Sequence, residues 1–219
     1  METLIPTDYQ KSIVVGLLFG DGYLYKNGRL QVEQSKNNQD YVIWLHKQLE
    51  NLASGKISHV TRVHSKSKKK SYSCRFYTKS VWADLESIFY TRGAVDRKRK
   101  KIVPRNLEQL LNPTVLAIWF MDDGGKSQST VKGAYINATS FSQQEQLEIQ
   151  KAFLHVFGLK INIHRAGGNN QYNFYIPADS YWRFYKIVFP IMKLVPSMIY
   201  KLSIIKSLGL ISPLVPWWA

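Results

Sequence analysis

The pattern of apolar and polar positions along the chain occurs twice. Residues 13–22 read IVVGLLFGDG and residues 116–125 read LAIWFMDDGG, so each stretch is an apolar run that ends in aspartate and glycine. A helix that is apolar on nearly all sides is a buried helix, so both runs predict helices of the core. The closing aspartates, Asp21 and Asp123, lie 102 residues apart. Such self-similarity indicates a duplicated structural unit.

The segments after the two apolar runs also correspond in order and type. Alternating polar and apolar positions predict strands, and apolar positions at helical spacing predict helices. The corresponding elements are strand pairs at 23–34 and 128–139, helices at 38–52 and 143–157, hairpins at 56–78 and 160–176, and helices from Ser80 and Ser180. Each half therefore reads α-β-β-α-β-β-α, which predicts an α+β fold with halves at residues 1–105 and 106–219.

The net charge points to a polyanionic partner. The 219 residues include 30 Lys and Arg against 15 Asp and Glu, a net of +15, and nucleic acid is the first expectation for such a protein. The positive charge is concentrated in clusters at 66–70 and 97–101. The first cluster lies between two strand-like runs, so it predicts a lysine-rich hairpin tip that contacts phosphates. A solvated loop is the alternative.

Several other classes of protein are excluded, because the chain lacks their sequence features. Cys74 is the single cysteine, so a secreted scaffold held by internal disulfides is excluded. The N-terminus has neither the basic nor the apolar region of a secretory signal. The longest uncharged stretch near the C-terminus, residues 207–219, is shorter than the roughly 20 residues that a membrane helix needs. We therefore expect no membrane partner.

The two aspartates stand at an unfavourable place for a carboxylate. The C-terminal end of a helix is the negative end of its dipole, so Asp21 and Asp123 predict a compensating cation. Gly16 and Gly20 leave one stripe of the first helix without side chains, so a partner helix can approach closely. If the two apolar helices pack about a pseudo-twofold axis, both carboxylates meet at one end. Hard oxygen ligands of this kind suit Mg²⁺, Mn²⁺ or Ca²⁺.

These segments resemble the LAGLIDADG homing endonucleases in their single-chain form with two motifs. The two motifs are VVGLLFGDG at 14–22 and LAIWFMDDG at 116–124. The likeness covers residues 10–203 and includes KKIVPRNL at 100–107 and VPSMIYKL at 195–202. The chain departs from the motif at Phe19 and at Ile118, so the close glycine contact is expected on one helix only. Residues 204–219 have no counterpart in this likeness.

The resemblance implies a monomer in which each half contributes a four-stranded antiparallel saddle to the major groove of double-stranded DNA. It implies a site-specific endonuclease that cuts both strands of a long asymmetric target with a stagger. Asp21 and Asp123, with the backbone oxygens of Gly20 and Asp122, would bind Mg²⁺. Mn²⁺ would substitute for Mg²⁺, and Ca²⁺ would support binding with little or no cleavage.

The resemblance also implies a basic residue near each scissile phosphate. These are Lys101 in the first half and Lys201 in the second half. Within this chain, however, the pattern Lys101-Ile-Val-Pro corresponds to Lys193-Leu-Val-Pro, so Lys193 remains an alternative for the second site.

Strand alternation predicts which side chains face the DNA. Tyr72, Cys74 and Phe76 are expected to point inward, with polar neighbours outward. The residues expected at DNA in the first half are Arg29, Gln31, Glu33, Arg62, His64, Lys66, Lys68, Lys69, Lys70, Ser73 and Arg75. Those of the second half are Lys132, Tyr135, Asn137, Lys160, Asn162, His164, Gln171, Asn173 and Tyr175.

Two alternative functions remain open. The first is an RNA maturase that assists splicing of its host group I intron, since a charge of +15 suits RNA equally well. The second is a DNA-binding regulator without catalysis, although such proteins typically lose the acids that this chain keeps. For a protein of this kind we expect an organelle genome, chloroplast or mitochondrial, as the source.

Overall fold

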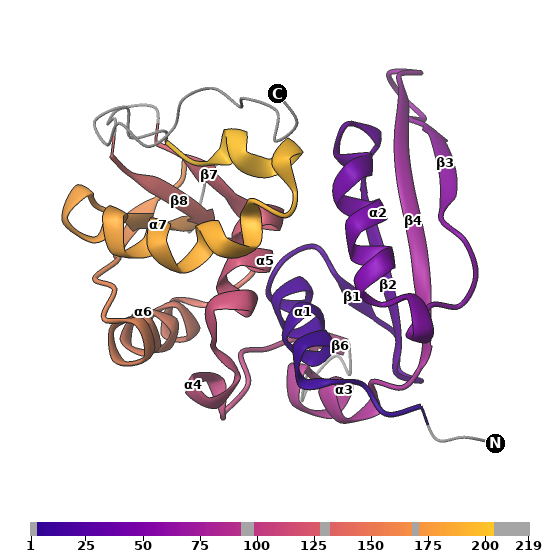
Figure 1. The fold of residues 1–219 in the computed structure, drawn as a ribbon. Coiled ribbons are helices and arrows are strands. Elements are labelled where there is room, and N and C mark those ends of the chain that lie inside the picture. The colour runs from indigo at the N-terminus through magenta and orange to yellow at the C-terminus, as the bar shows by residue number, and fades with distance from the viewer. Residues whose placement is uncertain (1–3, 93–98, 128–131, 168–170, 204–219) are drawn as a thin grey trace, which may run out of the picture.

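The computed structural model describes residues 4–92, 99–127, 132–167 and 171–203 (Figure 1). The two apolar runs form helices α1 (Asp8–Phe19) and α5 (Pro113–Asp123), which pack against each other at the centre of the molecule. One antiparallel sheet lies on each side of this helix pair (Figure 1). The helix pair therefore joins the two halves.

The first sheet has the strand order β1-β2-β4-β3 and the second has the order β7-β8-β10-β9. The strands of the first are β1 (Tyr23–Leu24), β2 (Arg29–Ser35), β3 (Ser58–Val63) and β4 (Lys70–Ser80). Those of the second are β7 (Gly124–Lys126), β8 (Ala134–Asn137), β9 (Asn162–Arg165) and β10 (Tyr172–Ile176). The shared order confirms the predicted α+β fold of two equivalent halves with four-stranded antiparallel sheets.

Helices cover one face of each sheet. They are α2 (Gln39–Gln48) in the first half, and α6 (Gln143–Phe157) and α7 (Ala178–Met192) in the second. Helix α3 (Ala83–Phe89) follows the last strand of the first sheet. Inward side chains pair at equivalent places, with Val32 opposite Phe76 in one sheet and Ile136 opposite Phe174 in the other. All four side chains are buried. None of the helices in the described part of the chain has the length and apolar composition to cross a membrane.

Smaller elements complete the chain. They are a ribbon of β5 (Tyr90–Arg92) and β6 (Arg99–Lys101), helix α4 (Leu107–Leu110), and 3-10 turns at Lys36–Asn38, Glu50–Leu52 and Pro196–Lys201. The β5–β6 ribbon was not predicted. The predicted boundary at residue 105 falls between β6 and α4, and it stays a prediction.

The central helices begin at strong caps. Thr7 and Gln10 form a capping box at the start of α1. At the start of α5, the side chain of Asn112 accepts a hydrogen bond of 3.0 Å from the backbone N–H of Val115, and Pro113 is the first helical residue. These contacts satisfy N–H groups that have no partner inside the helix.

The helices approach each other on the glycine stripe of α1. A Cβ atom on Gly16 would lie 2.6 Å from the Cβ of Ile118, and one on Gly20 would lie 2.5 Å from the Cβ of Asp122. Real Cβ atoms do not come this close, so both positions need glycine. The close contact is one-sided, as expected from the departure at Ile118.

Three details differ from the predictions. The strand pair expected at 128–139 begins earlier, because β7 lies at Gly124–Lys126, and residues 128–131 lie outside the described ranges. Cys74 and Phe76 are buried, but Tyr72 is 50% exposed, because the β3–β4 hairpin extends beyond α2 at this point (Figure 1). The two acids also end their helices differently. Helix α5 continues through Asp123, whereas α1 ends at Phe19, because Gly20 leaves the helical conformation with φ −94° and ψ −131°.

Candidate active site

Three carboxylates meet where α1 and α5 end. The backbone N–H of Asp21 donates a hydrogen bond of 3.1 Å to Oδ2 of Asp122, so the ends of the two helices are directly joined. Asp21 is exposed, whereas Asp122 and Asp123 are half-buried. The predicted meeting of Asp21 and Asp123 at one end of the helix pair is therefore present. The side chain of Asp122, for which only the backbone oxygen was considered, lies with them.

A glutamine from the first sheet bridges two of these acids. Nε2 of Gln34 donates to Oδ2 of Asp21 at 2.8 Å and to Oδ1 of Asp122 at 3.2 Å. Gln34 is buried on the inward side of β2. Sequence reasoning missed it, although a signal existed: Leu30 and Val32 are the preceding inward positions, and a polar residue there is unusual.

Tyr41 on α2 lies behind the acids. Its hydroxyl is buried and, among the described residues, has no partner in hydrogen-bond geometry. Burial, and then the neighbouring carboxyl of Asp122, raise the pKa of Tyr41 well above its ordinary value. Sequence reasoning missed Tyr41 as well, because an aromatic residue on a helix reads as ordinary core.

Two lysines bind equivalent backbone carbonyls. Nζ of Lys101 donates to the carbonyl oxygens of Gly20 at 3.2 Å and Gly22 at 3.4 Å. Nζ of Lys201 donates to the carbonyl of Asp122 at 2.8 Å and to that of Met121. In each half, the ammonium group thus contacts the residue that precedes the motif acid. Lys193 is exposed directly after α7, and no hydrogen bond joins it to these carbonyls.

The electrostatics of the site favour neutral carboxyl groups. Burial raises the pKa of Asp123 to about 6, and the charge of Asp21 acts in the same direction, while Lys101 and Lys201 oppose it. Burial and then Asp21 also hold the pKa of Asp122 well above its ordinary value. Burial lowers the pKa of both lysines. When the carboxyl groups are ionised, the two lysines therefore do not fully compensate the negative charge of the site.

The donor set fits a hard divalent cation. Mg²⁺ in proteins typically takes one or two carboxylates and completes its shell with waters and substrate phosphates. In the described ranges, no group of three or more His, Cys, Asp or Glu residues is placed to hold a metal ion by itself. An ion here would need backbone, water or phosphate oxygens in addition. The carbonyls of Gly20 and Asp122 already accept from lysine, but a carbonyl oxygen has two lone pairs.

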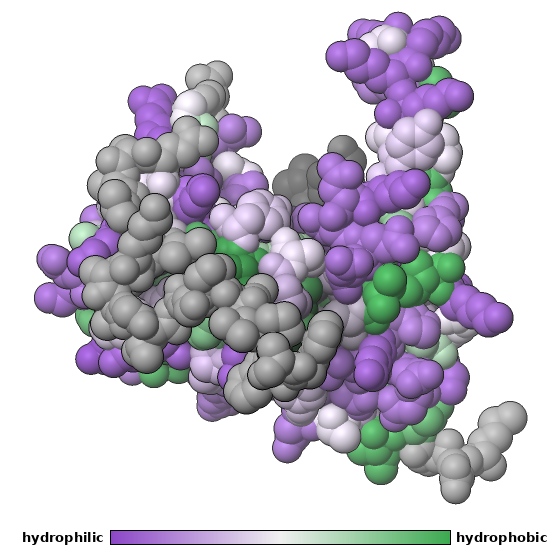
Figure 2. All heavy atoms as spheres, turned by 45° about the horizontal axis from the view of Figure 1, so that its top comes forward, coloured by the Kyte–Doolittle hydropathy of each residue, from purple (hydrophilic) through white to green (hydrophobic). Residues whose placement is uncertain are grey.

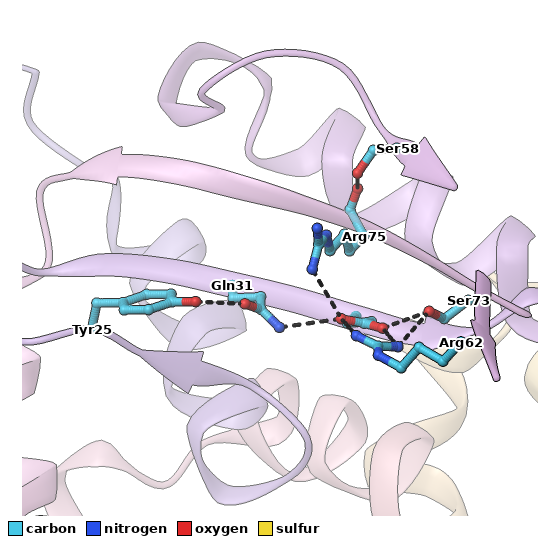
Figure 3. Close-up of polar contacts among 7 residues, drawn as sticks. Tyr25, Gln31, Ser58, Arg62, Ser73 and Arg75 are labelled. Atoms are coloured by element: carbon cyan, nitrogen blue, oxygen red, sulfur yellow. Dashed lines mark hydrogen bonds and ion pairs between the residues drawn. The ribbon is translucent and has the colours of Figure 1, made fainter. Parts of the chain in front are cut away.

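One face of the first sheet was predicted to contact DNA, and we call it the reading face. Its polar side chains form a hydrogen-bonded network around Glu33 (Figure 3). The guanidinium of Arg62 forms a bidentate pair with Glu33, and the hydroxyl of Ser73 also donates to this carboxylate. Gln31 donates to Glu33 at 3.2 Å, and Arg75 lies 3.9 Å from it. The Arg62 pair lowers the pKa of Glu33 despite partial burial.

Aromatic side chains extend this network. The hydroxyl of Tyr25 donates to Gln31 at 2.8 Å (Figure 3). The guanidinium of Arg29 lies over the ring of Tyr77, 4.2 Å from its centroid. Neither tyrosine was predicted at the DNA face. For Tyr77 the signal was its equivalence to Tyr175, which was predicted.

The lysine cluster lies at the tip of the β3–β4 hairpin, which projects as a hydrophilic arm (Figure 2). Lys66, Lys68 and Lys69 lie in the turn, and Lys70 begins β4. Nδ1 of His64 accepts a hydrogen bond of 3.1 Å from the backbone N–H of Ser67 within the turn. All four lysines are exposed.

The corresponding face of the second sheet carries stacked rings and asparagines in place of a charged network. Tyr175 stacks on His164 with ring centroids 4.7 Å apart, and it lies 4.8 Å from Tyr135. Asn173 lies opposite Asn137 on one neighbouring strand and opposite His164 on the other. The remaining predicted positions, Lys132, Lys160, Asn162 and Gln171, are exposed on or beside these strands.

Comparison with known proteins identifies the class. The sequence pattern of the LAGLIDADG DNA endonuclease family matches residues 11–184. The chain therefore belongs to the LAGLIDADG DNA endonuclease family.

Individual relatives and structures agree with this assignment. The chain is 29% identical over 200 residues to cytochrome b mRNA maturase bI2 of Debaryomyces hansenii, covering 87% of this chain and 72% of the relative. It is 26% identical over 210 residues to the DNA endonuclease I-ChuI of Chlamydomonas applanata, covering 90% and 95%. The fold matches that of the homing endonuclease I-WcaI bound to its DNA recognition sequence, with a TM-score of 0.80, 24% identity, and coverage of 91% and 88%.

Proposed function

We propose that this protein is a site-specific DNA endonuclease that hydrolyses both strands of a long asymmetric target with a stagger and needs a divalent metal ion. The observation that supports this most is the meeting of Asp21 and Asp123 at the foot of the helix pair, each with a lysine on the preceding carbonyl. Two polar sheet faces flank this point. The halves differ in sequence, so the target is asymmetric.

Phosphodiester hydrolysis needs an activated water and a stabilised leaving oxygen. A bound Mg²⁺ or Mn²⁺ supplies both, and Asp21 and Asp123 would hold it. Lys101 and Lys201 would stabilise the charge that develops on the phosphate. Their lowered pKa values favour this role, because a buried ammonium group gains from the approach of a phosphate.

Affinity and specificity would come from different parts of the chain. The lysine-rich hairpin tip would contact backbone phosphates, which adds affinity without sequence preference. The faces around Glu33 and Tyr175 would read base edges in the major groove. Both halves belong to one chain, so we propose that a monomer binds one target.

Cleavage of a candidate target tests the proposal. Relatives include an intron-encoded endonuclease of Dictyostelium discoideum, so the sequence that spans the uninterrupted insertion site of the host intron is the first target to try. The protein should linearise a plasmid with this site in Mg²⁺ but not in EDTA. Ca²⁺ should support binding with little or no cleavage. A plasmid that stays intact in every divalent metal while the protein binds it would exclude the nuclease function.

A second candidate function is splicing assistance. Two of the relatives are cytochrome b mRNA maturases, from Debaryomyces hansenii and Saccharomyces cerevisiae. These relatives also suggest an organelle genome as the source. Self-splicing of the host intron, measured with and without the protein, tests this function. A variant that lacks both Asp21 and Asp123 should not cleave DNA. If this variant still makes splicing faster than it is without protein, splicing assistance is established independently of cleavage.

A further inference from the structure

Three aromatic rings form a continuous stack along α7. The rings of Trp182 and Tyr185 lie 5.5 Å apart at an angle of 14°, and those of Tyr185 and Phe189 lie 4.8 Å apart at 15°. Their positions, three and four residues apart, place them on one side of the helix. Tyr185 and Phe189 are half-buried, whereas Trp182 is 38% exposed. The stack therefore presents its first ring to the solvent.

The core of the second half does not use this tryptophan. Helix α7 packs inward through other side chains, and the ring of Phe184 lies 4.9 Å from that of Phe120 on α5. In the first half, Trp82 follows the corresponding serine by the same two residues. Trp82 is buried, and its Nε1 donates to Oγ1 of Thr78 at 3.1 Å. The two halves thus differ, and only the second presents such a ring on its outer side.

Cationic groups surround the exposed ring. Nζ of Lys186 lies over the ring of Trp182, 5.1 Å from its centroid. The surface beside them is hollowed, with a volume of about 530 Å³, and it is lined by Asp179, Trp182, Arg183, Lys186 and Ile187. Both cationic side chains of this lining are exposed. The hollow therefore combines an aromatic ring, two positive charges and one carboxylate.

This combination suits a nucleotide more than a simple anion. Unpaired bases stack on exposed aromatic rings, and basic side chains beside the ring bind the phosphates. The carboxylate of Asp179 would repel a phosphate inside the hollow, but a carboxylate accepts a hydrogen bond from a base amino group such as N4 of cytosine. A base in the hollow, with its phosphate at Lys186 or Arg183, satisfies all three kinds of group.

The outer side of α7 faces away from the predicted DNA face of the second sheet. Phe174 of β10 is buried, and its ring lies 6.0 Å from that of Trp119 on α5. Its strand neighbours Asn173 and Tyr175 therefore point to the opposite face of the sheet. Because α7 packs against α5, it lies on the side of Phe174 (Figure 1). A ligand on the outer side of α7 and DNA on the sheet can therefore be bound together.

We propose that the outer side of α7 binds an unpaired segment of RNA, with one base stacked on Trp182 and its phosphate held by Lys186. This inference rests on the second candidate function, splicing assistance, and it gives that function a surface separate from the DNA face. A nucleic-acid duplex does not fit the same contacts, because its bases are already stacked on each other.

RNA binding by surface variants tests the proposal. The probes are single-stranded oligocytidylate, single-stranded oligouridylate and an RNA duplex, each titrated with excess duplex DNA present to occupy the sheet faces. Wild type should bind oligocytidylate most tightly and the duplex least, and tryptophan fluorescence should fall on binding. Trp182→Leu should weaken oligocytidylate binding by about tenfold or more and remove most of the fluorescence change. Trp182→Phe keeps a ring, so it should lose much less.

The charge contribution is measured separately. Lys186→Gln should flatten the dependence of log K on log salt by about 0.7, the value for one lost phosphate contact on a single strand. Lys47→Gln is the matched control, because Lys47 is exposed on α2 in the first half. The control should keep both the affinity and the salt slope. All four variants should keep the wild-type melting temperature and rate of DNA cleavage.

The outcomes separate this inference from the functions proposed above. Unchanged oligocytidylate binding in Trp182→Leu would overturn the inference, even if the protein assists splicing. Equal losses in Trp182→Leu and Trp182→Phe, or tighter binding of the RNA duplex than of the single strands, would also overturn it, because stacking would not be the mode of binding. Wild-type protein that neither binds these RNAs nor speeds splicing would overturn both the inference and splicing assistance, while the endonuclease function stands.

Discussion

The Cβ atom of Ile118 lies 2.6 Å from the place that a Cβ atom on Gly16 would occupy. The two central helices are therefore in contact through a side chain of α5 and the bare backbone of α1. No pair of ordinary side chains at these positions permits the same distance between the helices. This spacing also sets how close the acids at the helix ends come to each other.

Gly16→Ala should destabilise the protein and separate the acids. Overpacking of this kind costs about 1–3 kcal/mol, because the new methyl group must displace Ile118 or the helix backbone. Denaturant unfolding should show the loss, and cleavage should fall further than the loss of folded protein explains. Adding Ile118→Gly should give back part of the cleavage activity. A Gly16→Ala variant with wild-type stability would contradict the close contact.

Asp21→Asn and Asp123→Asn should each abolish double-strand cleavage but keep specific binding in Ca²⁺ nearly intact. The acids organise the metal ion, while affinity comes from lysine and arginine contacts with many phosphates. Gel-shift titration and plasmid linearisation measure the two properties on the same preparations. Cleavage by either variant at the wild-type rate would show that the active site lies elsewhere.

Asp123→Asn should stabilise the metal-free protein at neutral pH. Burial raises the pKa of Asp123 from its ordinary value of 3.8 to about 6, so the folded state keeps this proton up to a higher pH than the unfolded state does. Wild-type stability therefore falls as the pH rises from about 4 to about 6, by up to about 3 kcal/mol, and stays lower above pH 6. Thermal unfolding in EDTA should show a higher melting temperature for the variant at pH 7.5 than for wild type.

The same measurement contains its own controls. At pH 4 the two proteins should unfold at similar temperatures, because the side chain at position 123 is then neutral in the folded state of both. Adding Mg²⁺ at pH 7.5 should narrow the difference, since an ion compensates the wild-type carboxylate. Equal stability of both proteins in EDTA at pH 7.5 would contradict the raised pKa.

Lys201→Met should abolish or strongly slow the cut of one strand, whereas Lys193→Met should leave both rates close to wild type. The ammonium of Lys201 contacts the carbonyl of Asp122, while Lys193 is exposed at the end of α7. Both variants remove one positive charge from neighbouring parts of the chain, so each controls for the other in binding. A reversed result would favour the correspondence between Lys101 and Lys193.

Replacement of Lys68, Lys69 and Lys70 by alanine should weaken binding to matched and mismatched sites equally. It should also flatten the dependence of log K on log salt by about 0.9 per lost phosphate contact. Arg75→Ala, on the reading face, should instead cost about 1–3 kcal/mol at the correct target and relax preference at one position. A triple lysine variant with altered base preference and an unchanged salt slope would mean that the tip reads sequence.

Local patterns were sufficient to predict the fold. Alternation along β2 and β4 and the repeated order of elements follow from which side chains are apolar, and the structure confirms both. The projection of the hairpin at Tyr72 was not predictable in this way, because exposure there depends on where α2 ends. The β5–β6 ribbon is short and strongly charged, so it has no apolar alternation to detect.

The acids and lysines were found from motifs, but their support was not. Gln34 and Tyr41 reach Asp122 from other elements, and such contacts depend on tertiary packing that no local pattern encodes. The side chain of Asp122 was overlooked for a different reason. It stands beside the motif acid in sequence, and only the glycine at position 20 of the partner helix makes space for it.

The network around Glu33 has a consequence for attempts to redirect this protein to another DNA sequence. Its carboxylate is shared by Gln31, Arg62 and Ser73, so replacing one of them changes the pairing of the others. The effects of single substitutions in such a cluster do not add. A new target for the first half must therefore be selected by varying these positions together.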